Sequence, residues 1–170
     1  FEYITFKTQI LESAYQKTSD KSYLEEAISD YERLLEEHPE HVTLLNNLAY
    51  LLAENDQKLE QAMEYAKKAH KLRPNEPGLL DTYAYVLYKN GRLEEAEKFA
   101  RSAVQQYDSF RVQIPGEVYY HLGIINEKQG DTKEALEAYE QATGSDASNL
   151  TEAQRGEIEA SIARLSGQGS

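Results

Sequence analysis

The sequence of 170 residues predicts an all-α solenoid made of four helical hairpins and a C-terminal capping helix. Small residues recur on the first helix of each predicted hairpin, at steps of 35, 35 and 39 residues: Ala14, Ala49, Ala84 and Gly123. A second series recurs on the second helices, at steps of 35, 34 and 39 residues: Ala27, Ala62, Ala96 and Ala135. A period of this length is typical of stacked hairpins, because a single hairpin cannot bury its own apolar face.

The first hairpin is expected over about residues 8–40. Its first helix is predicted from about Glu2 to Gln16, with a buried stripe at a spacing of four residues: Phe6, Ile10 and Ala14. Ser22, with Glu25 three residues later, is expected to form a capping box that opens the second helix. That helix is predicted to end before Pro39, because the residue before a proline avoids the helical conformation.

The second and third hairpins are expected over about residues 41–75 and 76–108. Pro74 ends the second hairpin, and Pro77 is placed in the first turn of the third, where proline is well tolerated. Apolar residues recur at helical spacing through both hairpins, and Asn90–Gly91 marks the turn between the two helices of the third.

The fourth hairpin is expected over about residues 116–147, after an insertion of about five residues that lengthens the period. A turn at Gly130 separates its helices, and Asp131 with Glu134 is expected to cap the second one. The last helix, residues 151–165, is predicted to close the stack with one apolar side: Ile158, Ile162 and Leu165.

A capping box of Thr151 and Gln154 is expected to open this last helix, whose polar residues are placed on the side facing water: Glu157, Glu159 and Arg164. Residues 1–166 are therefore predicted to form a single domain, and residues 167–170 a disordered tail.

Composition and charge exclude several classes of function. The net charge of −12 disfavours nucleic acids and anionic membrane surfaces as partners and permits a neutral or basic protein. No apolar run approaches the roughly 20 residues of a membrane span, so we expect no direct membrane insertion. The absence of cysteine excludes disulfides and thiolate metal sites.

The repeat residues resemble those of the tetratricopeptide repeat family, in a form expected for a bacterial protein. In the second repeat they are Leu48, Ala49, Ala62, Ala69 and Pro74, and in the fourth Leu122, Gly123, Gly130, Ala135, Tyr139 and Ala142. The segments NGRLEEAEKFARSAV (90–104) and QGDTKEALEAYEQA (129–142) are similar to second halves of that repeat. The resemblance covers about residues 8–142.

The resemblance implies a right-handed superhelix whose first helices line a concave groove. Members of the family hold a peptide or a partner's helix there, and they act as scaffolds rather than enzymes. Carried onto this sequence, the groove-facing positions are Tyr15, Asn46, Asn47, Tyr50, Asp81, Thr82, Tyr85, Tyr88, Glu117, Tyr120, His121 and Ile124.

Tyr15, Tyr50 and Tyr85 are spaced by 35 residues and each follows a small residue of the first series. We expect them to form a tyrosine ladder along the groove, since tyrosine offers a flat apolar surface with a polar tip. The alternative is that these rings pack between neighbouring repeats.

No residues point to catalysis, a cofactor or a metal. His38 and His41 flank Pro39 without a third ligand, so a loop is the better interpretation. His121 lies one helical turn after Glu117, and a hydrogen-bonding role in the groove is favoured over a general-base pair.

A family subtype binds C-terminal carboxylates with a clamp of lysine, asparagine and arginine. The matching positions in this chain hold only one such residue, Asn47, so no carboxylate clamp is predicted.

The leading hypothesis is therefore a protein-interaction scaffold for a neutral or basic peptide or helix. A second is a carbohydrate-binding module, because LNNLAYLLAEN and LLDTYAYVLYKNGRLEEAE are similar to bacterial repeats associated with export of envelope polysaccharide. A third is self-association into a homodimer through apolar residues of the first helix: Phe1, Tyr3, Ile4 and Phe6. The compartment stays open between the cytoplasm and the bacterial periplasm or envelope.

Overall fold

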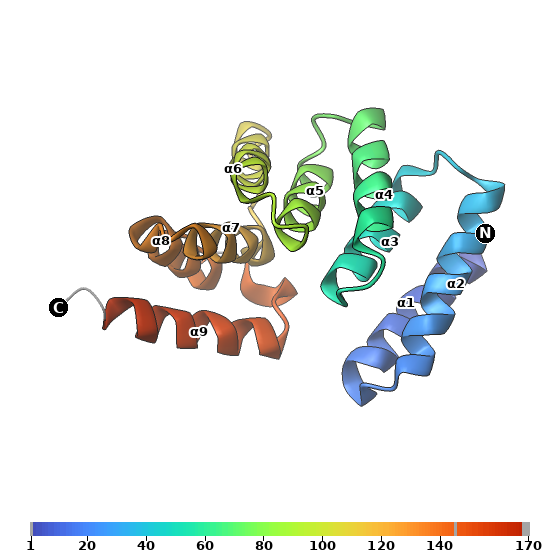
Figure 1. Ribbon diagram of the computed structural model, residues 1–170, viewed down its shortest axis with the longest axis horizontal. Coiled ribbons are helices and arrows are strands. Elements are labelled where there is room, and N and C mark those ends of the chain that lie inside the picture. Colours follow the sequence, from blue (N-terminus) through green and yellow to red (C-terminus); the bar gives the residue numbers. More distant parts are fainter. Residues whose placement is uncertain (1, 145, 168–170) are drawn as a thin grey trace. The chain divides into compact units, whose positions relative to one another are not determined.

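The computed structural model describes residues 2–144 and 146–167, with the side chains of residues 2–5 and 9 left out. These residues form nine α-helices and a short 3-10 helix, which confirms the all-α prediction (Figure 1). In chain order the elements are α1 (Glu2–Thr18), α2 (Lys21–Glu37), α3 (Val42–Glu54), α4 (Leu59–Leu72), α5 (Pro77–Lys89), α6 (Leu93–Ser109), α7 (Gly116–Gln129), α8 (Thr132–Gly144), η1 (Ala147–Asn149) and α9 (Glu152–Ser166).

The helices divide into two compact units, Phe1–Arg73 and Pro74–Ser170, and each is described by itself. The predicted single domain over residues 1–166 stays a prediction. The expectations for Phe1, Tyr3 and Ile4, and for most of the tail at 167–170, lie outside the described side chains and residues.

In the first unit, α1 packs on α2, α2 on α3, and α3 on α4. The small-residue series marks core positions here, since Ala27, Ala49 and Ala62 have no exposed surface. Short side chains at these positions let the helices approach closely, as the repeat pattern predicts.

The stripe predicted for α1 is wrong. Phe6 is 63% exposed and Ile10 is 53% exposed, whereas Thr8 and Leu11 are buried. Polar contacts with α2 set this orientation: Lys7 Nζ lies 2.8 Å from Asp30 Oδ2, and the Tyr31 hydroxyl donates to Glu12 Oε1 at 2.8 Å. A helix that keeps these contacts turns the face carrying Phe6 and Ile10 toward solvent.

The helix caps agree with the sequence in one case and differ in another. Asp20, rather than Ser22, caps α2, because Asp20 Oδ1 accepts a hydrogen bond from Ser22 N at 3.0 Å. The predicted box of Ser22 with Glu25 is therefore wrong. At α9 the predicted box is confirmed: Thr151 Oγ1 accepts from Gln154 N at 3.1 Å, and Gln154 Oε1 accepts from Thr151 N at 2.8 Å.

In the second unit, α5 packs on α6, α6 and α5 on α7, α7 on α8, and α8 on α9. Gly123 allows the close approach that the small-residue series predicts: a Cβ added there would lie 2.5 Å from Tyr139 Cε1. Only glycine fits at this point of α7.

The predicted apolar side of α9 closes the second unit. Ile158 and Leu165 are buried in one cluster with the α8 residues Ala135, Tyr139 and Ala142, and Ile162 packs against it. The prediction of a capping helix is confirmed in this respect. The polar residues that flank the buried side of α9 come near α7, where the candidate site is found.

Candidate binding surfaces

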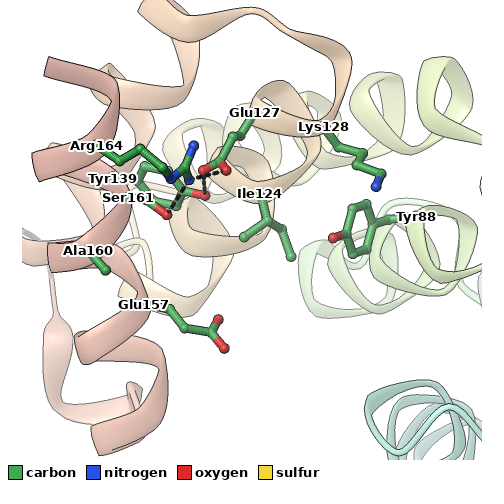
Figure 2. A pocket seen from close by; sticks show the side chains of 9 residues that line it. All are labelled: Tyr88, Ile124, Glu127, Lys128, Tyr139, Glu157, Ala160, Ser161 and Arg164. Atoms are coloured by element: carbon green, nitrogen blue, oxygen red, sulfur yellow. Dashed lines mark hydrogen bonds and ion pairs between the residues drawn. The ribbon is translucent and has the colours of Figure 1, made fainter. Parts of the chain in front are cut away.

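A pocket of about 390 Å³ lies on the second unit, between the first helices α5 and α7 and the capping helix α9 (Figure 2). Its lining consists of two predicted groove residues and seven others: Tyr88, Ile124, Glu127, Lys128, Tyr139, Glu157, Ala160, Ser161 and Arg164. The repeat register of α5 and α7 places Tyr88 and Ile124 here, which form its apolar wall. Pockets with an apolar wall and a few polar groups are typical of ligand sites.

One side of this pocket is held rigid by hydrogen bonds to a carboxylate. The Tyr139 hydroxyl donates to Glu127 Oε2 at 2.8 Å, and Arg164 of α9 pairs with Glu127 Oε1. Burial alone would raise the pKa of Glu127, but the hydrogen bonds from Tyr139 and Arg164 outweigh it and hold the pKa below its usual value. The ion pair ties α9 to α7, so this wall is positioned before any ligand arrives.

Glu157 points into the pocket from α9 (Figure 2), and its Oε2 accepts a hydrogen bond from the Tyr120 hydroxyl at 2.5 Å. Burial and this carboxylate raise the pKa of Tyr120. Tyr120 therefore stays a neutral donor and orients Glu157, which is itself exposed to solvent. The carboxylate is available to a cation on a partner.

Five of the predicted groove residues are buried instead: Asp81, Thr82, Tyr85, Tyr120 and His121. His121 has no exposed surface, and its Nδ1 lies 3.0 Å from both carboxylate oxygens of Asp81. Tyr85 stacks on the His121 ring, with centroids 4.4 Å apart and 22° between the planes. In this arrangement the residues join α5 to α7 and present little surface to a ligand.

The remaining predicted groove residues lie at the surface of one unit or the other. Tyr15 and Tyr50 line one pocket of the first unit. Asn46 is half-buried, and Asn47 Nδ2 donates to the Tyr31 hydroxyl at 3.4 Å. Glu117 Oε1 accepts from Gln154 Nε2 at 3.4 Å. Since Tyr85 belongs to the second unit, the ladder as a whole stays a prediction.

The contribution of α9 to the site was not predicted from the sequence. Glu157, Ser161 and Arg164 lie at positions i, i+4 and i+7 of one helix face, next to the buried side of α9. That spacing was a usable signal, because polar residues so placed flank the apolar stripe of a helix that must pack on its neighbours. The sequence around Glu127 did not indicate its role in the pocket, because its hydrogen-bond partners come from other helices, α8 and α9.

The described part of the chain offers neither a metal site nor a membrane span. No group of three or more histidine, aspartate or glutamate side chains there is arranged to hold a metal. Nor does any helix of residues 2–144 and 146–167 reach the length and apolarity that a membrane span needs.

Comparison with curated proteins finds the TPR repeat-containing protein PA4667 of Pseudomonas aeruginosa, 33% identical over 108 residues. The match covers 64% of this chain and 17% of that protein, so the chain spans about a sixth of the length of this relative. The relative is bacterial, in agreement with the expected origin.

Solved structures with the same fold include pilF of Pseudomonas aeruginosa, with a TM-score of 0.70, 20% identity, and coverage of 99% of this chain and 69% of that one. MamA matches with a TM-score of 0.63 and 20% identity, over 90% of this chain and 83% of that one. A thermophilic TPR protein of Thermus thermophilus matches with a TM-score of 0.65 and 17% identity, over 92% and 89% of the two chains. At these identities the structures show the fold alone.

Two family models, both described as tetratricopeptide repeat, match residues 23–77 and 78–146. Together they cover well over half of the sequence with the repeats that its small residues mark. The chain therefore belongs to the tetratricopeptide repeat family.

Proposed function

We propose that this chain is a non-enzymatic scaffold that holds a neutral or basic peptide or helix of a partner protein on the surface of its first helices. The family fold supports protein–protein interaction in general, and members of the family are generally scaffolds rather than enzymes. The partly exposed members of the predicted set would form contacts within each unit: Tyr15, Asn46, Asn47 and Tyr50 in the first, and Tyr88, Glu117 and Ile124 in the second.

The observation that carries this proposal is the pocket between α5, α7 and α9. Tyr88 and Ile124 provide an apolar wall for one side chain of the partner, and Glu157 provides an oriented carboxylate. Arg164 is neutralised by Glu127, so it does not oppose a cation at Glu157. Lys128 lies by Tyr88, on another side of Ile124 (Figure 2), where it can meet a backbone carbonyl of the same peptide. A neutral or basic segment fits this distribution of charge.

Selection from a random peptide library, followed by calorimetry on the selected peptides, tests the proposal. We expect Tyr88→Ala and Glu157→Gln each to weaken binding by about tenfold, the size of one lost charge-assisted contact or aromatic anchor. Glu159→Gln is the matched control, because Glu159 is exposed on the same helix and does not line the pocket. Selected peptides that bind all three variants as well as the wild type, or binding to glycans with no peptide selected, would contradict the proposal.

Self-association is a second candidate, favoured by one observation on the first unit. Phe6 and Ile10 are largely exposed and lie four residues apart on α1, which places two large apolar side chains on the same face. Sedimentation velocity over a range of concentrations tests it. A dimer that Phe6→Glu with Ile10→Glu converts to a monomer supports this function, and a monomeric wild type at high concentration excludes it.

A further inference from the structure

A smaller pocket lies on the first unit, lined by residues of α1 and of the C-terminal end of α3. Its volume is about 200 Å³, close to that of one large side chain. Tyr15 and Tyr50 both line it, as do Glu12, Glu54 and Asn55. The repeat spacing of the two tyrosines thus brings two rings of the predicted ladder to one cavity.

The described charged residues that line this cavity are all acidic. Two of its lining residues are glutamates, and no described lysine, arginine or histidine lines it. The pocket of the second unit differs, because Lys128 and Arg164 line it together with its glutamates. Two tyrosines and two glutamates, with no basic residue among the described lining residues, form an environment that favours a cation, since aromatic faces and carboxylates both attract positive charge.

Glu12 is held in place by contacts beneath the cavity. The Tyr31 hydroxyl donates to Glu12 Oε1 at 2.8 Å, and Asn47 Nδ2 in turn donates to the Tyr31 oxygen at 3.4 Å. Burial raises the pKa of Glu12, and the Tyr31 hydrogen bond only partly offsets this effect. A cation entering the cavity would favour the ionised form of Glu12, so its binding and the deprotonation of Glu12 are coupled.

We propose that this cavity binds the side chain of a lysine on the partner protein. The inference rests on the proposed function in one respect, because the scaffold's partner would deliver that lysine. The alkyl chain would lie against the rings of Tyr15 and Tyr50, and the ammonium would meet the carboxylates of Glu12 and Glu54.

Lysine fits these acceptors better than arginine does. An ammonium has three donors that point in different directions, whereas a guanidinium presents a flat fork suited to one carboxylate. The acceptors here come separately from two helices, with Glu12 on α1 and Glu54 on α3. Asn55 also lines the cavity, and its Nδ2 donates to Leu51 O at 2.8 Å, so that bond does not use the amide oxygen.

Titration of the whole chain with Nα-acetyl-lysine N-methylamide, followed by the backbone amide signals in NMR spectra, tests the site. We expect saturable shifts at residues 12–16 and 50–55, and about tenfold weaker binding of the norleucine analogue, which lacks the ammonium. Binding should strengthen as the pH rises through the folded pKa of Glu12, which lies above its ordinary value of 4.5. Equal affinity for the norleucine analogue, or tighter binding of the arginine analogue, overturns the assignment.

Variants separate this site from the pocket of the second unit. Glu12→Gln with Glu54→Gln should weaken lysine binding by about tenfold or more while preserving the fold, because glutamine keeps the acceptor for Tyr31. Glu36→Gln is the control, since Glu36 is exposed on α2 and lines a different pocket. If the double variant binds the lysine probe like the wild type, the assignment fails. Tyr88→Ala is expected to lose binding of the selected peptides while it keeps binding of the lysine probe, because Tyr88 lines only the pocket of the second unit. The lysine site and the peptide pocket can therefore be disproved independently of each other.

Discussion

His121 Nδ1 on α7 lies 3.0 Å from both carboxylate oxygens of Asp81 on α5, and the two side chains are buried together. The pair joins the first helices of two successive hairpins in the second unit. Burial raises the pKa of Asp81, and the nearby His121 opposes that effect. A polar pair inside the unit is stable only while each member has the other, because an isolated buried charge or donor is costly.

Asp81→Ala is therefore expected to lower the free energy of unfolding by about 3 kcal/mol, since it leaves His121 buried without its carboxylate. Urea denaturation followed by circular dichroism measures the change. Asp108→Ala, at an exposed position of α6, is the control and should change stability by less than about 0.5 kcal/mol. Equal stability of the two variants would show that the pair contributes nothing to holding α5 and α7 together.

Gly123→Ala should destabilise the second unit by about 1–3 kcal/mol through overpacking. The added Cβ would lie 2.5 Å from the ring of Tyr139, which is itself buried and hydrogen-bonded to Glu127, so the ring has little freedom to move. Gly156→Ala is a matched control, because it is also inside a helix but a Cβ there meets nothing within 4 Å. We expect the control to stabilise the chain by about 0.5–1 kcal/mol, since alanine favours the helix. Thermal unfolding of the two variants distinguishes these opposite signs.

The small-residue period predicted this packing because it records a local requirement. Ala49, Ala84 and Gly123 must be short for their own hairpin to close, and each hairpin repeats that requirement at the same position. The stripe of α1 failed for the opposite reason. Its orientation depends on Asp30 and Tyr31 of the next helix, which the apolar pattern of α1 does not contain.

Some residues of the candidate site could be predicted from the repeat register, and others could not. Tyr88 and Ile124 could be placed by repeat register alone, and both line the pocket of the second unit. Register placed His121 in the groove as well, but it could not show that Asp81, 40 residues earlier, would hold the ring in the interior. Glu157 and Arg164 were assigned to water, because the repeat period does not specify how α9 docks on α7.

Glu127→Gln should lower stability at neutral pH by about 0.5–1 kcal/mol, the size of a partly exposed ion pair. The pKa of Glu127 in the folded chain lies below its ordinary value of 4.5, so the folded state favours the carboxylate. Its contribution is present above about pH 4.5 and is lost as the pH falls through the lower folded pKa. Unfolding free energies of the wild type and the variant should therefore converge in acid.

A double-mutant cycle with Arg164→Gln assigns the effect to the ion pair. The coupling energy between positions 127 and 164 should be favourable at pH 7 and should decline as the pH falls through the folded pKa of Glu127, which lies below 4.5. A coupling that stays constant throughout an acid titration would mean that the pair acts through packing rather than charge.

Thr151→Ala should cost about 1 kcal/mol and should act mainly on α9. Thr151 Oγ1 accepts from Gln154 N, and the reciprocal bond from Thr151 N to Gln154 Oε1 completes the box, so the first turn of α9 loses an acceptor for its backbone donor. Because α9 supplies Glu157, Ser161 and Arg164 to the pocket, a loosened α9 should weaken peptide binding without removing any side chain that lines it.

Amide hydrogen exchange gives the direct measurement: protection should fall across residues 152–166 and stay unchanged in α5 and α6. Thr143→Ala, at the exposed end of α8, is the control. Uniform loss of protection throughout the second unit would instead mean that α9 unfolds only together with the hairpins it covers.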